Sequence, residues 1–236
     1  MSDAIHPPIK RLPTGLPALD SILNGGFLQG GIYMVVGTPG AGKTILGNQL
    51  CFNHVSHGGR AIYMTLLAET HARMLAHING LSFFDPAPIG DTLTYISGYK
   101  TLESEGLSSL VKFIGRTVRE HRATLLVIDG LATAVSISPT HLDYRRFLHE
   151  LQVLVETLGC TAFLLNQPGR ESLHHEQTMV DGLVYMADRL VGPRAVRELE
   201  ITKFRGSNFL RGRHLFEITD DGIVLHPRLE ALLPHP

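Results

Sequence analysis

Residues 37–44 read Gly-Thr-Pro-Gly-Ala-Gly-Lys-Thr and match the phosphate-binding pattern G-x-x-x-x-G-K-[ST] at every fixed position. This loop follows the apolar run 31–36 and precedes the amphipathic stretch 45–55, so its context is strand, loop and helix. Glycines let the backbone curl with its N–H groups pointing inward, and the helix N-terminus adds a positive field at the same point. We therefore predict a phosphate-binding loop. The alternative is a glycine-rich turn that binds nothing.

The residue types of this loop indicate which parts of a ligand they hold. Lys43 is expected to reach the β- and γ-phosphates, and Thr44 to give its hydroxyl to Mg²⁺. Pro39 fixes one backbone angle, so fewer conformations are lost on binding. The predicted nucleotide-binding residues of this stretch are Thr38, Pro39, Gly40, Ala41, Gly42, Lys43, Thr44 and Ile45.

The bulk composition is that of an ordinary folded chain. Of the 236 residues, 44% are hydrophobic and 18% are charged, and the formal net charge is −1. These values exclude a disordered polymer and provide no global basic field for nucleic acid or an anionic membrane. We predict one domain over residues 1–236, with an extended arm at 1–13 and a tail at 226–236. The apolar runs are strand-length and no signal peptide is evident, so a cytoplasmic protein without a membrane partner is expected.

Hydrophobic periodicity alternates between strand and helix along the first two thirds of the chain. The strands it predicts are residues 31–36, 61–66, 92–96, 125–128 and 160–165. The helices it predicts are residues 18–23, 45–55, 71–77, 102–121 and 147–158. Loops are expected at 130–141 and 170–181, and closely spaced β segments at 182–188, 196–204 and 215–219. The fold class is therefore α/β: a mostly parallel sheet flanked by helices, with antiparallel strands added by the C-terminal third.

Two carboxylates follow predicted strands. Asp129 ends the apolar run 125–128, where phosphate-loop enzymes keep the acidic residue that holds Mg²⁺. Ligands of parallel sheets collect at the carboxyl ends of the strands, so Asp129 is expected beside Thr44. Glu69 lies just beyond strand 61–66 and is the candidate general base for the attacking water. The alternatives are a turn-capping aspartate and a glutamate favoured at a helix N-terminus.

Three further polar residues are candidates for the reaction. Gln167 follows the strand at 160–165, where a neutral amide can sense the γ-phosphate and pass that signal to the next loop. Its alternative is a plain turn. Lys203 and Arg205 stand two residues apart in a predicted strand and so project from one face. Such a cationic pair suits phosphate recognition at a subunit boundary. Its alternative is an edge strand blunted by charge.

Several stretches together resemble the KaiC branch of RecA-like ATPases. They are TGLPALDSILNGG at 14–26, GTPGAGKT at 37–44, LLVIDG at 125–130, the Asn166-Gln167 strand end, and ITKFRGSNFLRGRHLFEITDDGI at 201–223. The likeness runs from about Pro13 to Val224. The KFRGS and EITDDGI signatures within it are more specific than a phosphate loop alone.

The resemblance implies a RecA-like P-loop core, ATP and Mg²⁺ as cofactors, and a ring with nucleotide at each subunit interface, expected to be a homohexamer. It also implies that five residues approach the nucleotide of the neighbouring subunit: Lys203, Arg205, Ser207, Thr219 and Asp220. Lys203 and Arg205 would then act in trans, as an arginine finger does.

The chain departs from the family pattern at two places. The family carries two adjacent glutamates after the second strand, whereas here Leu67 and Ala68 precede the single Glu69. Glu69 therefore remains the best base, although its register is shifted by one residue. Autophosphorylating relatives carry a Ser/Thr pair before the strand that begins near Gly182, and here only Thr178 offers a hydroxyl.

These observations leave three functional hypotheses. The first is an oligomeric ATPase that hydrolyses ATP slowly and changes ring conformation for a protein partner that the sequence does not identify. The second is a RecA-like DNA-binding ATPase that uses the loop 170–181, although Glu171 and Glu176 weaken any grip on phosphate there. The third is an autokinase that phosphorylates Thr178.

Overall fold

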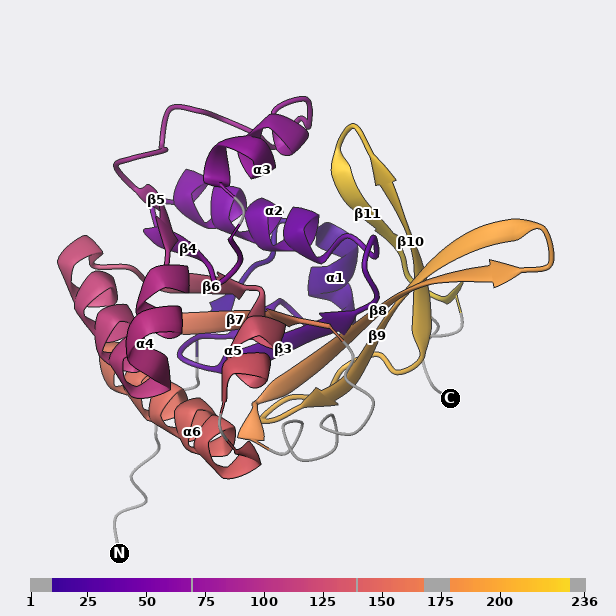
Figure 1. Cartoon of the computed structure of the whole chain (residues 1–236). Helices are drawn as coiled ribbons and strands as arrows, with labels where there is room; N and C mark the ends of the chain where they lie inside the picture. Colours follow the sequence, from indigo (N-terminus) through magenta and orange to yellow (C-terminus); the bar gives the residue numbers. More distant parts are fainter. Residues whose placement is uncertain (1–9, 69, 139, 168–178, 230–236) are drawn as a thin grey trace, which may run out of the picture.

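The computed structural model describes residues 10–68, 70–138, 140–167 and 179–229. Within these ranges, nine strands form one sheet in the order β11-β10-β9-β8-β3-β7-β6-β4-β5, and β1 pairs with β2 beside it (Figure 1). The strands are β1 Arg11–Leu12, β2 Phe27–Leu28, β3 Ile32–Gly37, β4 Ala61–Thr65, β5 Leu93–Ser97, β6 Leu125–Asp129, β7 Thr161–Asn166, β8 Gly182–Val191, β9 Arg194–Phe204, β10 Arg213–Thr219 and β11 Gly222–His226. The helices are α1 Pro17–Ile22, α2 Lys43–Ser56, α3 His71–Ile78, α4 Tyr99–His121, α5 Leu131–Ile137 and α6 His141–Leu158.

The centre of the sheet is buried on both faces. In β3, Tyr33 and Val35 join one hydrophobic cluster with residues of α1 and α2, while Met34 and Val36 join a second cluster with residues of α4 and α6. Figure 1 shows the corresponding layers, with α1, α2 and α3 over one face and α4, α5 and α6 over the other. Successive strand residues point to opposite faces, so the solidly apolar runs of the sequence become the middle of a three-layer α/β fold.

The parallel and antiparallel parts of the sheet divide as predicted. Strands β3, β7, β6, β4 and β5 are mutually parallel, and β8 pairs in parallel with β3. From β8 onward each pairing is antiparallel, between β8 and β9, β9 and β10, and β10 and β11. The α/β class with C-terminal antiparallel strands is therefore confirmed.

Some elements differ from the periodicity. The expected loop at 130–141 contains α5, a helix of 7 residues that begins after Gly130 in a left-handed conformation. Such a helix is too short to show a period, and it forms because Leu131 and Ala134 are buried. Helix α4 begins at Tyr99 and breaks at Gly106, whose φ of 80° is non-helical. The strand β11 and the short strands β1 and β2 were not predicted from the pattern.

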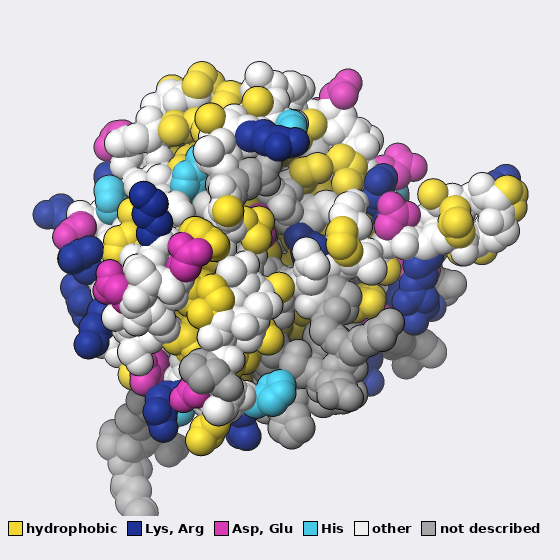
Figure 2. Space-filling model, in the orientation of Figure 1, with side chains coloured by type: hydrophobic (Ala, Val, Ile, Leu, Met, Phe, Trp, Pro, Cys, Tyr) yellow, Lys and Arg dark blue, Asp and Glu magenta, His cyan; other side chains and the backbone are white. Residues whose placement is uncertain are grey.

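The β8–β9 hairpin extends past the body of the sheet. Only residues 182–186 of β8 pair with β3, whereas the hairpin continues to Val191 and Arg194. Its tip exposes 78% of Leu190 and 59% of Val191, and in Figure 2 this region projects at the right as a lobe rich in hydrophobic side chains.

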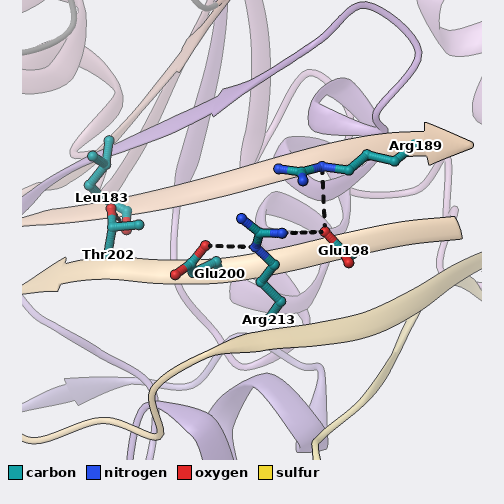
Figure 3. A network of polar contacts seen from close by, with 6 residues as sticks. All are labelled: Leu183, Arg189, Glu198, Glu200, Thr202 and Arg213. Atoms are coloured by element: carbon teal, nitrogen blue, oxygen red, sulfur yellow. Dashed lines mark hydrogen bonds and ion pairs between the residues drawn. The ribbon is translucent and has the colours of Figure 1, made fainter. Parts of the chain in front are cut away.

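Ion pairs tie the hairpin to β10. Glu198 lies 3.5 Å from Arg189 and 3.7 Å from Arg213, and Glu200 lies 3.4 Å from Arg213 (Figure 3). These contacts link three adjacent strands through half-exposed charges, so they align the strands more than they add stability.

Among the described helices, none combines the length and the apolar character needed to cross a membrane.

Candidate functional site

The predicted phosphate loop joins β3 to α2. Gly40 and Gly42 have φ of 81° and 91°, a region that side-chain-bearing residues rarely adopt. Gly42 is the N-cap of α2, so the loop curls directly into the N-terminus of a helix of 14 residues. A Cβ added at Gly42 would lie 2.9 Å from Ile218 Cδ1, so β10 packs against the loop. The loop therefore leads into the positive end of a helix, which favours an anion at this point.

Lys43 lies inside this site. Its Nζ donates to the carbonyl oxygens of Gly37 and Thr38 over 2.7 and 2.9 Å. Burial lowers the pKa of Lys43, and the Asp129 carboxylate partly opposes that shift. The ammonium group is therefore partly desolvated and held by the loop, so a phosphate would meet a cation that has already lost some of its hydration.

Thr44 and Asp129 converge as the sequence predicted. Asp129 ends β6, is 9% exposed, and accepts a hydrogen bond at Oδ2 from Thr44 Oγ1 over 2.9 Å. A hydroxyl and a carboxylate are oxygen donors of the kind Mg²⁺ prefers. The described residues contain no group of three or more His, Cys, Asp or Glu side chains able to hold a metal. A hydroxyl and a single carboxylate fit an ion such as Mg²⁺, which takes one or two protein ligands and is otherwise held by phosphates and water.

A tyrosine that sequence reasoning missed completes this pair. Tyr63, in the middle of β4, donates its hydroxyl to Asp129 Oδ2 over 2.7 Å. Burial, and next the negative charge of Asp129, raise the pKa of Tyr63 well above its usual value. The phenol therefore stays protonated and keeps donating. The sequence carries only a weak signal for it, a tyrosine inside a largely apolar strand, whereas the pairing of that strand with β6 comes from the fold.

A second polar chain supports the first turn of α2. Asn48 Nδ2 donates to the Thr44 carbonyl over 2.8 Å, and Asn48 Oδ1 accepts from Tyr95 over 2.7 Å. The Tyr95 ring lies 5.8 Å from the His71 ring and 5.5 Å from that of Tyr63. These contacts join β4, β5 and α3 to the helix that carries Lys43 and Thr44. They were not visible as a motif.

Gln167 follows β7, which ends at the same edge of the sheet as the phosphate loop, because Asn166 pairs with Val36. Asn166 is 4% exposed and its Oδ1 accepts from the Gln167 backbone N–H over 2.9 Å. The Gln167 side chain itself is exposed. Its position at this edge is compatible with the predicted sensing role, which stays a prediction.

The segment after β4 carries the departure from the family pattern. Leu67 is 38% exposed, and a Cβ added at Gly130 would lie 2.7 Å from its side chain. Glu69, the predicted base, lies outside the described residues, as do Thr178 and most of the loop 170–181. Their predicted roles stay predictions.

Lys203 and Arg205 lie at the opposite edge of the sheet from the phosphate loop. Gly37 pairs with Met186, whereas Gly182, at the other end of the same β8 segment, pairs with Phe204. Arg205 comes directly after Phe204 in the chain, and its guanidinium Nη1 lies 3.8 Å from Asp181 Oδ1. The pKa of Lys203 is lowered mainly by burial and, as the second cause, by the positive charge of Arg205. The two cations therefore lie close together, but away from Lys43 of their own chain.

The remaining three predicted ligands divide between these two edges. Ser207 lies near Arg205 in sequence and its Oγ accepts from Arg11 over 2.6 Å. Thr219 ends β10 and Asp220 lies in the turn that follows, beside Ile218, which packs on the phosphate loop. Ser82 N–H donates to the Asp220 carbonyl over 2.8 Å. The five residues that the resemblance assigned to a neighbour's nucleotide thus lie at opposite edges of one sheet.

The fold and the site define a RecA-like P-loop ATPase, and the comparisons with known proteins specify the family. The family model described as "ATPase: KaiC" matches residues 12–230. The chain belongs to this KaiC ATPase family.

Individual relatives agree with this assignment. The UPF0273 protein of Thermotoga maritima is 30% identical and is aligned over 93% of this chain and 97% of its own. The circadian clock oscillator protein KaiC of Picosynechococcus is 24% identical over 93% of this chain, which spans 45% of that protein. The crystal structure of a KaiC-like protein from Pyrococcus horikoshii has a TM-score of 0.80 at 21% identity, covering 93% of this chain and 100% of that one.

Proposed function

We propose that this protein is an ATP-binding and slowly ATP-hydrolysing KaiC-like protein that assembles head to tail into a ring and acts as a conformational switch for a protein partner. ATP with Mg²⁺ is the proposed ligand, and a homohexamer is the proposed assembly. Family membership and the phosphate-loop geometry support nucleotide binding. The ring and the role as a conformational switch are additional parts of the proposal.

One observation carries the assembly. The phosphate loop with Thr44 and Asp129 occupies one edge of the sheet, and Lys203 and Arg205 occupy the other. One chain cannot bring both groups to a single phosphate. A head-to-tail contact can, because it places the cationic edge of one subunit against the phosphate-loop edge of the next. Such heterologous contacts close into rings, or form helical filaments when the rotation does not close.

The residues of this chain divide the work. The loop N–H groups and Lys43 bind the phosphates, while Thr44 and Asp129 would hold Mg²⁺, which when bound neutralises charge on the phosphates. Glu69 is the proposed base that polarises the attacking water. Lys203 and Arg205 of the neighbour stabilise negative charge as the terminal phosphate leaves.

Slow turnover follows from the region after β4. The family's pair of glutamates is replaced by Leu67 and Ala68, so a single shifted carboxylate remains. A base that is displaced from its best position by even ~1 Å loses on the order of 10²-fold in rate. Long-lived ATP suits a protein whose output is a bound conformation rather than a flux of product.

Size-exclusion chromatography with light scattering, with and without ATP and Mg²⁺, tests the assembly. We expect a closed oligomer with ATP, together with slow release of phosphate. A strict monomer under both conditions would remove the trans role of Lys203 and Arg205. Open-ended filaments, or stimulation of hydrolysis by single-stranded DNA at low salt, would favour the DNA-binding alternative. A mass increase after incubation with ATP would favour autophosphorylation.

A further inference from the structure

The hydroxyl of Tyr63 has no part in the functions proposed so far. It donates to Asp129 Oδ2 over 2.7 Å, and Thr44 Oγ1 donates to the same oxygen over 2.9 Å. One carboxylate oxygen therefore accepts from two sides. Both of these side-chain donors bond to Oδ2, and a carboxylate has a second oxygen, Oδ1, that can also accept or coordinate.

Two donors on one oxygen fix a carboxylate more firmly than one donor does. With Thr44 alone, the carboxylate can rotate about its terminal torsion, which is broad for aspartate. A second donor, which comes from β4 and not from helix α2, removes that freedom. Hydrogen bonds to ionised acceptors are also the stronger kind, so the orientation is held energetically as well as sterically.

The packing around Tyr63 prevents its hydroxyl from moving away. The side chain is 0% exposed, and its ring lies 5.5 Å from that of Tyr95. On the helix side, a Cβ added at Gly47 would lie 3.3 Å from the Tyr63 ring. The ring is therefore enclosed by β5 and α2, and its hydroxyl stays directed at Asp129.

We propose that Tyr63 is a positioning residue for magnesium, which fixes the Asp129 carboxylate in the orientation that holds the ion together with Thr44. This inference rests on the proposed function, because it assigns a role within the same site. Partners that orient metal-binding groups typically change metal affinity by roughly 10–100-fold when they are removed. The competing explanation is that the phenol only satisfies its own buried hydroxyl, in which case magnesium affinity would not depend on it.

The test is Tyr63→Phe, which removes the hydroxyl and keeps the ring. The matched control is Tyr33→Phe. Tyr33 is also buried, at 1% exposure, and its hydroxyl bonds to the Leu28 backbone at 2.8 and 2.9 Å. Both variants lose one buried hydroxyl from the same sheet, but only one loses a partner of Asp129.

Binding of a fluorescent ATP analogue is measured as Mg²⁺ is titrated, and again in EDTA. For Tyr63→Phe we expect the Mg²⁺ midpoint to rise roughly 10–100-fold while binding in EDTA is unchanged. Tyr33→Phe should match the wild type in both. In an Asp129→Asn background, Tyr63→Phe should cause no further change, because the two act through one carboxylate.

Equal Mg²⁺ midpoints for Tyr63→Phe and the wild type would overturn the inference and leave the proposed function standing. A Tyr63→Phe protein that is unfolded without ligand, while Tyr33→Phe is folded, would show a purely structural role and also overturn it. A wild-type protein that binds the analogue at no Mg²⁺ concentration would instead overturn the proposed function.

Discussion

Replacing Arg205 with alanine separates its structural role from its proposed catalytic one. In the isolated chain, Arg205 lies 3.8 Å from Asp181, and the two side chains are 53% and 28% exposed. A solvent-screened pair of this kind contributes at most about 1 kcal/mol to the free energy of unfolding. An arginine finger contributes about 10³–10⁵-fold to turnover, or about 4–7 kcal/mol of transition-state stabilisation. Arg205→Ala should therefore remain folded and lose hydrolysis.

The assay is release of phosphate from bound ATP in a single turnover, together with thermal unfolding of the ligand-free protein. Arg213→Ala is the matched control, since Arg213 has a side chain 50% exposed, pairs with Glu200 at 3.4 Å and Glu198 at 3.7 Å, and has no part in the proposed nucleotide site. We expect both variants to melt within a few degrees of the wild type, and only Arg205→Ala to fall by about 10³-fold or more in rate. Rates within tenfold of each other for the two variants would refute the role in trans.

Three further predictions concern the site and the fold. Gly42→Ala should lower the free energy of unfolding by about 1–2 kcal/mol through left-handed strain, and it should also weaken ATP binding because Gly42 lies in the phosphate loop. Gly58 has a φ of 82° and open space around it, so Gly58→Ala is the control. In thermal melts and ATP titrations, Gly58→Ala should show the loss of stability without the loss of ATP binding. Glu69→Gln should retain ATP binding and lower turnover by about 10²–10⁴-fold, and an unchanged rate would exclude Glu69 as the base. His214 is 0% exposed, and burial is the largest cause that lowers its pKa in the folded chain. As the pH falls, the unfolded chain therefore protonates this histidine at a higher pH than the folded chain does. The contribution of His214 to the free energy of unfolding is therefore fully present above about pH 6.5, and below that pH it falls by at most about 1.4 kcal/mol per pH unit. A His214→Gln variant whose melting temperature declines with falling pH as steeply as that of the wild type would contradict this.

The phosphate loop and Asp129 could be predicted from the sequence, because each lies at a recognisable place in a local pattern. The phosphate loop has fixed spacing, and Asp129 ends an apolar strand, so their meeting at 2.9 Å between Thr44 and Asp129 follows from the topology of a parallel sheet. The same patterns give the α/β layers, because a buried strand and an amphipathic helix each have a distinct period.

The rest depends on contacts that no local pattern encodes. Tyr63 reaches Asp129 only because β4 and β6 pair with Thr65 beside Asp129, a register that tertiary packing sets. The separation of Thr219 from Lys203 likewise arises from the order of β8, β9 and β10 in the sheet. In the sequence these residues belong to one continuous signature, so their division between two edges was not predictable from it.

The most direct test of the central claim is complementation between two variants that are each inactive. Lys43→Ala removes the phosphate-loop lysine, and Arg205→Ala removes the proposed finger. Differently tagged chains of the two kinds are co-expressed, purified through both tags, and assayed for hydrolysis.

If nucleotide lies between subunits, an Arg205→Ala chain keeps an intact phosphate loop and can receive Arg205 from a Lys43→Ala neighbour. Random mixing then restores about a quarter of the interfaces, since each needs one particular order of the two chains. We predict recovery to about that fraction of wild-type turnover. Mixed oligomers that remain as inactive as either parent would contradict the head-to-tail site.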